Sequence, residues 1–304
     1  MTRVFSTGPR ARHNGLMPLE TSQDSPELAP AATLVYGTDS PNQVIDLYVP
    51  DGSGPWPLVL GIHGGAFMRG DRSWERPHVP ALIGQGYAFA AIEYRLSGEA
   101  LFPAAVQDVK QATAYLRANA AELNLDPSFF AAWGRSAGGH LAAMLGVTSG
   151  QVTEFDGPGD GDSSVQAVVD LYGPSDFLQM DAQFIAKPPT GDVPPVQNHD
   201  EPGSPESKWL GGPVQELPEA AARANPITYL AGAPAALPPF FLAAGTSDHL
   251  VPHQQTLILA DALAAQGVPV VLHVLVGARH ADQRFETELK QPAIEWLDQL
   301  RKVR

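Results

Sequence analysis

The residues best suited to chemistry in this chain lie in Gly134-Arg135-Ser136-Ala137-Gly138, where a serine stands between two glycines. An apolar run typical of a buried strand (129–133) precedes it, and a helix-like apolar run (141–145) follows. A tight turn between strand and helix would strain the serine backbone, and glycines would let the two elements pass closely. Such a turn exposes the hydroxyl and aims a helix N-terminus at the bound ligand. We therefore predict Ser136 to be a nucleophile; the alternative is a turn that only reverses the chain.

A serine hydroxyl is a weak nucleophile unless a base accepts its proton and a third group orients that base. Downstream of Ser136, Asp248 directly follows an apolar run (240–244), and His280 follows another (268–276). Open α/β sheets gather functional groups at the carboxyl ends of their strands. We therefore predict Asp248 to be the acid and His280 the base. For His280 the alternative is a histidine in a surface loop without a catalytic role.

Acyl transfer through such a serine also needs backbone N–H groups that face the developing oxyanion. The run His63-Gly64-Gly65-Ala66 directly follows the apolar run 57–62. We predict that the amides of Gly65 and Ala66, together with that of Ala137, form the oxyanion hole. The histidine of this run is expected to hold the loop by hydrogen bonding. A plain Gly-Gly turn is the alternative.

Composition limits the classes of partner. The chain has 304 residues, 44% of them hydrophobic, which is enough for a substantial core. Nineteen Lys and Arg residues against 33 Asp and Glu residues give a net charge of −14, which argues against binding nucleic acid or an anionic membrane surface. The absence of cysteine excludes disulfides and thiolate sites. We expect no metal, because the acidic residues Asp156, Asp160 and Asp162 do not match a calcium loop. We expect no cofactor either, because acyl transfer through a serine needs none.

The first 32 residues contain no apolar run of the length found in signal peptides, and no stretch approaches 18 uninterrupted apolar residues. The expectation is a cytoplasmic protein that does not enter a membrane. The sequence does not indicate an oligomeric state.

Apolar runs and helical periodicities alternate along most of the chain, which predicts a mostly parallel central sheet with helices on both faces and an antiparallel start. We expect an N-terminal arm over 1–32 and one domain over 33–304. The stretch 176–230 is rich in proline and breaks the rhythm, so we expect an irregular, lid-like insertion; the alternative is a surface insertion without a role. The expected strands are 33–36, 44–49, 57–62, 87–94, 129–133, 165–172, 240–244 and 268–276, and the expected helices are 74–85, 104–122, 136–147, 254–266 and 292–300.

Several motifs together resemble the α/β-hydrolase esterases, most closely the BD-FAE-type feruloyl/acetyl esterases near the hormone-sensitive-lipase group. The resemblance covers roughly residues 33–300, and it rests on His63-Gly64-Gly65-Ala66-Phe67, Tyr94-Arg95-Leu96, Phe102-Pro103-Ala104-Ala105 with Asp108, Gly134 to His140, Gly245 to Pro252, and His280. It implies the α/β-hydrolase fold, with Ser136 as nucleophile, Asp248 as acid and His280 as base. Ala66 stands where hormone-sensitive-lipase relatives carry a third glycine, which favours the BD-FAE side.

The expected function is a serine carboxylester hydrolase that acts through an acyl-enzyme on small-molecule esters. The resemblance implies short-chain or aromatic esters of the acetyl and feruloyl type. Phe67, Trp74, Arg135 and Trp209 are candidates for substrate binding. For the three aromatic residues among them, the alternative is an ordinary place in the core. A peptidase or arylformamidase using the same three residues, or a ligand-binding protein without catalysis on this fold, remains an alternative.

Overall fold

The computed structural model describes residues 2–6, 28–157, 161–189, 198–231 and 237–303. Within them one sheet forms the centre of the molecule. Its strands are β1 (Thr2–Ser6), β2 (Ala32–Val35), β3 (Val44–Tyr48), β4 (Trp56–Ile62), β5 (Ala88–Ile92), β6 (Leu125–Arg135), β7 (Ala167–Leu171), β8 (Phe240–Gly245) and β9 (Val270–Leu275). Their spatial order is β1-β9-β8-β7-β6-β4-β5-β3-β2.

The sheet is antiparallel where β2 pairs with β3 and β3 with β5, and every other pair is parallel. The predicted mostly parallel sheet with an antiparallel start is therefore confirmed. Residues 2–6 of the expected arm join this sheet as β1, which pairs with β9. Residues 7–27 of the arm lie outside the described residues.

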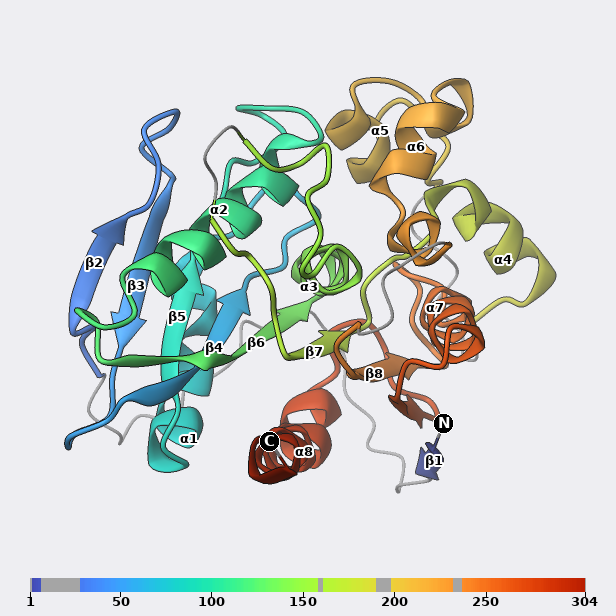
Figure 1. Cartoon of the computed structure of the whole chain (residues 1–304). Helices are drawn as coiled ribbons and strands as arrows, with labels where there is room; N and C mark the ends of the chain where they lie inside the picture. Colours follow the sequence, from blue (N-terminus) through green and yellow to red (C-terminus); the bar gives the residue numbers. More distant parts are fainter. Residues whose placement is uncertain (1, 7–27, 158–160, 190–197, 232–236, 304) are drawn as a thin grey trace.

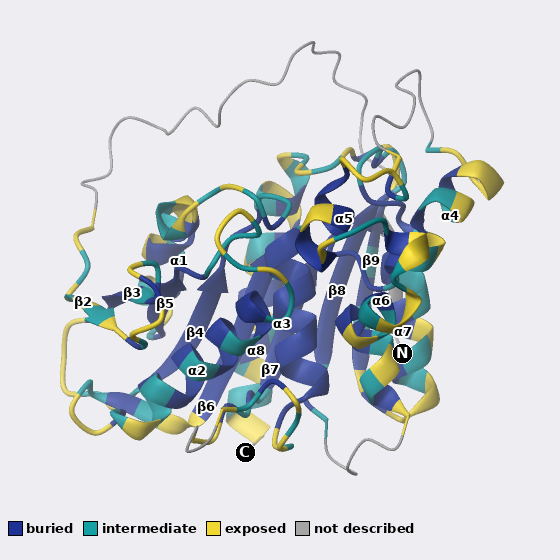
Figure 2. Ribbon diagram, turned by 90° about the horizontal axis from the view of Figure 1, so that it is seen from above, coloured by how far each residue is buried: buried dark blue, intermediate teal, exposed yellow. Residues whose placement is uncertain are grey.

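Helices cover both faces of the sheet (Figure 1). The helices α2 (Ala104–Ala118), α3 (Ala137–Val147) and α7 (Gln254–Ala265) pack on one face, and α1 (Val79–Gly84) and α8 (Lys290–Val303) on the other. Side chains of one strand alternate between the two cores. Leu58 and Leu60 belong to the core that includes α3, and Val59 belongs to the core that includes α1 and α8. Every residue of α3 is buried, and Figure 2 shows it with the central strands in dark blue. This burial explains why its sequence is apolar all round.

The predicted helix over 74–85 is divided in the structure. A 3₁₀ segment, η1 (Arg72–His78), precedes α1. Pro77 lies inside η1, and Pro80 is the second residue of α1. Because proline lacks an N–H group and clashes with the preceding turn, one continuous α-helix cannot form here.

The sequence analysis expected the insertion over 176–230 to be irregular. In the structure, its described part forms short helices instead. These are η2 (Phe177–Gln179), α4 (Met180–Ala186), α5 (Pro205–Leu210), η3 (Val214–Glu216), α6 (Pro218–Ala224) and η4 (Pro226–Leu230). Local sequence signals explain the ends of α5. The Ser204 side chain accepts a hydrogen bond from the Ser207 amide at its start, and Gly211 ends it in a left-handed conformation. Figure 1 shows α4, α5 and α6 gathered on the face opposite α8.

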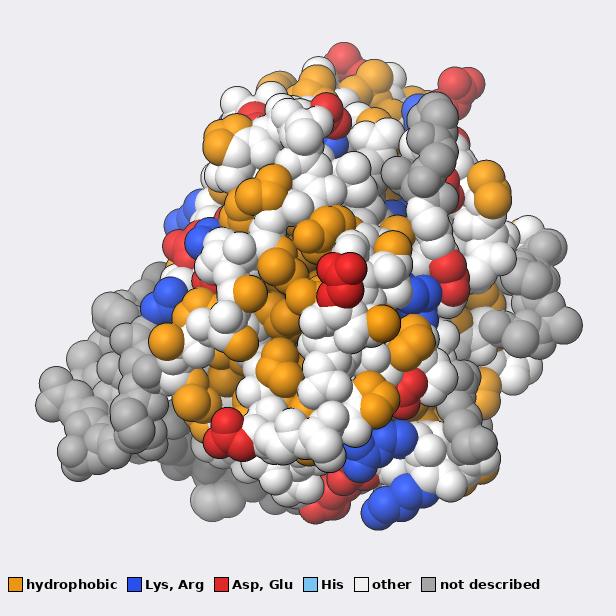
Figure 3. All heavy atoms as spheres, turned by 60° about the vertical axis from the view of Figure 1, so that its left-hand side comes forward, with side chains coloured by type: hydrophobic (Ala, Val, Ile, Leu, Met, Phe, Trp, Pro, Cys, Tyr) orange, Lys and Arg blue, Asp and Glu red, His pale blue; other side chains and the backbone are white. Residues whose placement is uncertain are grey.

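The surface mixes residue types. On the face of Figure 3, which brings the β2 and β3 side forward, hydrophobic side chains gather near the middle, and charged side chains of both signs lie around them. Trp74 and Leu101 are among the large hydrophobic side chains exposed on the molecule, at 45% and 49%.

Candidate active site

Ser136 lies in a sharp turn between β6 and α3. Its backbone has φ 55° and ψ −124°, a strained conformation for a residue with a side chain. Glycines allow the turn to close: a Cβ at Gly134 would lie 2.0 Å from the Gly138 carbonyl oxygen, and one at Gly138 would lie 2.0 Å from that of Ile62. The Ser136 amide donates to the Leu171 carbonyl at 2.9 Å, which fixes the turn against β7.

The structure brings Ser136, Asp248 and His280 together from the carboxyl ends of three strands. The His280 Nε2 atom lies 2.9 Å from Ser136 Oγ, and Nδ1 lies 2.7 Å from Asp248 Oδ2. A carboxylate only accepts hydrogen bonds, so Nδ1 carries the proton and Nε2 is free to accept one from the hydroxyl. The arrangement can deprotonate a serine hydroxyl.

Asp248 is held independently of the histidine. Its Oδ1 atom accepts hydrogen bonds from the amides of Leu250 and Val251, each at 2.9 Å, and only 2% of the residue is exposed. On the far side, Tyr172 packs edge-on against the His280 ring with centroids 4.9 Å apart. These contacts fix both the carboxylate and the imidazole in orientation.

The loop after β4 passes directly against the serine turn. A Cβ at Gly64 would lie 2.8 Å from the Arg135 carbonyl oxygen and 3.4 Å from Ser136 Cβ. Gly65 and Ala66 both have positive φ, 121° and 58°. Among the described residues, the amide N–H groups of Gly65, Ala66 and Ala137 have no hydrogen-bond acceptor, which leaves them available to an oxyanion.

His63 holds this loop, as the sequence analysis expected. Its Nδ1–H group donates to the Gly64 carbonyl at 2.7 Å, and its ring stacks on Tyr94 with centroids 4.3 Å apart. The Tyr94 hydroxyl donates to the His63 carbonyl at 2.9 Å, and Glu93 Oε1 lies 3.3 Å from His63 Nε2. The sequence analysis assigned no role to Glu93 or Tyr94, although Tyr94 belongs to the motifs that carry the family resemblance.

Two of the four candidates for substrate binding lie in the core. Phe67 and Trp209 are 1% and 0% exposed and stack face to face with centroids 4.0 Å apart. They pack with His140 and Phe177 in one aromatic cluster, so neither contacts solvent in this structure. Both are therefore core residues here and not walls of an open pocket, because each ring is covered by the others. Trp74 is exposed, and its ring lies edge-on to the His63 ring at 6.4 Å.

The fourth candidate, Arg135, directs its guanidinium group to other protein groups. It donates to Glu75 Oε1 at 2.8 Å and to the Trp74 carbonyl at 3.0 Å, and it lies 3.5 Å from Glu286 Oε1. Both terminal nitrogens of Arg135 therefore contact protein groups in this structure.

A buried acid beneath the site escaped the sequence analysis. Asp170 lies in β7 next to the first turn of α3 and is 1% exposed. Burial raises the pKa of Asp170 to about 7, although a hydrogen bond from the Gly173 amide at 3.0 Å opposes the rise. One signal in the sequence could have found it, namely a lone carboxylate inside the apolar run 167–171. Burial also lowers the pKa of the neighbouring His140 to about 4.

Within the described residues, no three His, Asp or Glu side chains are grouped so that they could hold a metal ion. None of the helices described here is both long and apolar enough to cross a membrane.

The sheet, the serine turn and the three side chains at the strand ends define an α/β-hydrolase. The BD-FAE family model matches residues 45–263, and the chain belongs to that family. It is 32% identical over 234 residues to the probable carboxylic ester hydrolase LipM of Mycobacterium tuberculosis (strain ATCC 25618 / H37Rv), covering 76% of this chain and 50% of LipM. It is 27% identical over 258 residues to the esterase LipQ of the same organism, covering 83% of this chain and 57% of LipQ.

The chain thus spans about half the length of these curated relatives. Among solved structures, a truncated form of a carbohydrate esterase from gut microbiota superimposes with a TM-score of 0.76 at 26% identity, covering 90% of this chain and 99% of that one. Thermogutta terrifontis esterase 2 superimposes with a TM-score of 0.69 at 24% identity, over 90% of this chain and 95% of that one, which supports the fold.

Proposed function

We propose that the protein is a serine carboxylester hydrolase that works through an acyl-enzyme. The observation that carries the proposal is the unbroken hydrogen-bond chain from Asp248 through His280 to the strained Ser136. The names of LipM and LipQ support the same reaction class. The set needs no cofactor, because hydroxyl, imidazole, carboxylate and amides supply all the groups that acyl transfer requires.

In the proposed reaction, Ser136 Oγ attacks the ester carbonyl carbon while His280 Nε2 takes the hydroxyl proton. Asp248 keeps the imidazole in the Nδ1–H tautomer and stabilises the imidazolium. The amides of Gly65, Ala66 and Ala137 bind the oxyanion. His280 then gives its proton to the leaving alcohol, and a water activated in the same way releases the acid and restores the serine.

We further propose that the substrates are small, neutral esters with short or aromatic acyl groups, of the acetyl or feruloyl type. Trp74 supports this, because an exposed indole beside the oxyanion loop can stack on an aromatic or sugar ring. The similar protein from gut microbiota is a carbohydrate esterase, which points the same way. We expect neither a nucleic-acid nor a membrane partner, and we propose that the enzyme acts in the cytoplasm. Fractionating cells that make the full-length protein tests that location.

A panel of nitrophenyl esters from acetate to longer acyl chains, together with methyl ferulate and a nitroanilide, tests the reaction. We expect hydrolysis of the short esters and of methyl ferulate, with slower turnover of the anilide. Ser136→Ala should lose this hydrolysis while the protein stays folded. Faster turnover of the anilide would make the protein an amidase or peptidase, and ester binding without hydrolysis would make it a binding protein.

A further inference from the structure

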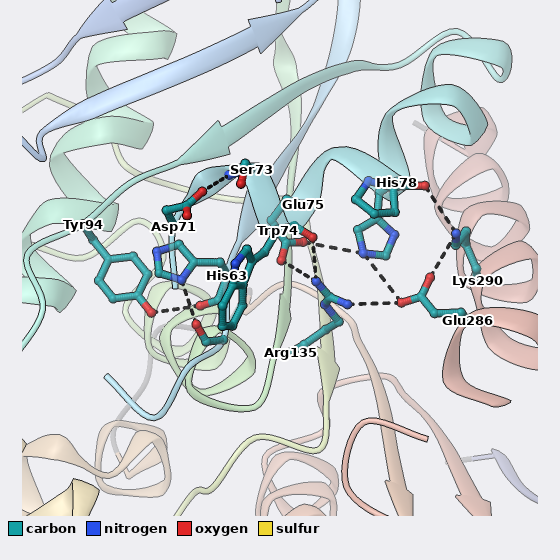
Figure 4. A network of polar contacts seen from close by, with 12 residues as sticks. His63, Asp71, Ser73, Trp74, Glu75, His78, Tyr94, Arg135, Glu286 and Lys290 are labelled. Atoms are coloured by element: carbon teal, nitrogen blue, oxygen red, sulfur yellow. Dashed lines mark hydrogen bonds and ion pairs between the residues drawn. The ribbon is translucent and has the colours of Figure 1, made fainter. Parts of the chain in front are cut away.

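A partly buried network of charges surrounds Arg135, the residue before the nucleophile (Figure 4). At its centre, Arg135 lies between the carboxylates of Glu75 and Glu286, at 2.8 and 3.5 Å. Lys290 Nζ contacts Glu286 at 2.9 Å, and His78 Nε2 lies 3.6 Å from Glu75 and 3.7 Å from Glu286. Glu75 is 0% exposed.

The network is balanced in charge. Burial lowers the pKa of His78 to about 4, and the positive charge of Arg135 contributes to this fall, so the imidazole is neutral. Burial raises the pKa of Glu75, but the positive charge of Arg135 opposes it and the net shift is downward. Two carboxylates therefore face two cations, Arg135 and Lys290, with a neutral histidine between them.

Each carboxylate anchors a different part of the proposed site. Glu75 belongs to η1, which starts at Arg72, directly after the loop that carries Gly65 and Ala66. Arg135 reaches this segment twice, through the Glu75 side chain and through the Trp74 carbonyl. The far end of the oxyanion loop is thereby tied to the residue that precedes the nucleophile.

Glu286 anchors the other side. It lies in the π-helical turn Phe285–Leu289, which follows the His280 loop and leads into α8. The Phe285 ring packs against Tyr172 with centroids 4.5 Å apart, and Tyr172 in turn packs against His280. A shift of this turn would therefore move Tyr172 and, through it, the His280 ring.

We propose that Arg135, Glu75 and Glu286 form a positioning unit that sets the oxyanion loop and the His280 loop relative to Ser136. The inference rests on the proposed function. None of the three contacts the reacting atoms; they act through the segments that they join. Buried ion pairs are costly to desolvate, so stability alone is a weak reason for this one. A planar guanidinium is suited to the task, because one group can hold partners on two sides at once.

The test compares Glu75→Gln, Glu286→Gln and Arg135→Lys with the wild type, using nitrophenyl acetate at 20 °C. Glu288→Gln is the matched control, because Glu288 pairs with Arg284 on the outside of the same segment. For Glu75→Gln we expect kcat to fall about 10- to 100-fold, with KM changed less than about twofold, since misplaced amides weaken transition-state binding. Glu286→Gln should have a smaller effect of the same kind because its contact is longer. Arg135→Lys should also lower kcat relative to the wild type, since one ammonium group cannot hold Glu75 and Glu286 at the same time.

Three outcomes would overturn the inference. Wild-type kcat in Glu75→Gln and Arg135→Lys, with only a lower melting temperature, would make the network purely structural. A fall in activity that comes from a displaced acid limb of the kcat/KM profile would make its role electrostatic. If Glu75→Gln fails to fold, the partly exposed Glu286→Gln decides by the same criteria. A wild type without esterase activity would instead refute the proposed function and this inference with it.

Discussion

Asp248 accepts hydrogen bonds on both of its oxygens, and only one of them serves the histidine. Replacement by asparagine keeps the shape and one acceptor. We expect the carbonyl of the new amide to retain the bonds from Leu250 and Val251, which turns its NH₂ group toward His280 Nδ1. The imidazole must then place its proton on Nε2, where it can no longer accept one from Ser136.

For Asp248→Asn we therefore expect kcat on nitrophenyl acetate to fall about 10⁴-fold with a small change in stability. Asp261→Asn on the exposed side of α7 is the control and should leave kcat unchanged. A loss of less than tenfold in Asp248→Asn would show that the carboxylate does not set the tautomer.

For Asp170, burial dominates the pKa and only the Gly173 amide opposes it, with no contribution from a cation among the described residues. The folded protein raises the pKa of this group from 3.8 to about 7, so folding favours the neutral acid. The native state then holds a proton that the unfolded chain has lost, and stability declines as the pH rises between these two values. Above pH 7 the full penalty, about 4 kcal/mol for about three pKa units, is present.

Asp170→Asn removes this titration. We expect the variant to gain stability relative to the wild type as the pH rises from 4 to 8, by up to about 4 kcal/mol. Urea unfolding of both proteins at pH 4, 5.5 and 8 measures the difference, and any constant cost of burying the amide cancels between pH values. A difference that does not depend on pH would show that folding does not raise the pKa of Asp170.

Among the elements, the serine turn depends on how closely β6 and α3 approach each other. A Cβ on Gly134 would lie 2.0 Å from the carbonyl oxygen and 2.2 Å from the carbonyl carbon of Gly138, and these backbone atoms cannot rotate away. We expect Gly134→Ala to abolish activity and to destabilise the fold by a few kcal/mol, as other overpacked sites do.

Gly84→Ala provides the matched control. A Cβ on Gly84, at the end of α1, would meet nothing within 4 Å. Alanine there should leave activity intact and add about 0.5 to 1 kcal/mol of stability. Thermal unfolding and nitrophenyl acetate turnover of the two variants make the comparison. Equal effects would mean that close approach at the turn is not what requires glycine.

The elements also show what a sequence can reveal. Strands and the order serine, acid, histidine were predictable, because apolar runs mark buried parallel strands and functional residues follow their ends. The helical pattern over 74–85 predicted one helix, and the break between η1 and α1 was missed although Pro77 marks it in the sequence. The role of Arg135 could not be predicted, since its partners stand 60 and 151 residues away along the chain. Contacts between residues so far apart in the sequence produce no periodic pattern from which they could be predicted.

For the whole molecule, the dominant electrostatic fact is the net charge of −14. Charges of both signs are interspersed on the face in Figure 3, so the excess acts chiefly as a long-range field. Such a field repels anionic substrates during their approach and leaves neutral ones unaffected. Its reach is about 30 Å at 10 mM salt and about 10 Å at 100 mM.

We therefore expect kcat/KM for an ester that carries a carboxylate, such as mono-nitrophenyl succinate, to rise severalfold between 10 and 200 mM sodium chloride. For the neutral nitrophenyl butyrate, whose acyl chain has the same length, kcat/KM should stay nearly constant, which makes it the internal control. Steady-state kinetics at both salt concentrations give the two ratios. A fall for the anionic ester would mean that local cations outweigh the global charge, and the preferred substrates would then be anionic esters.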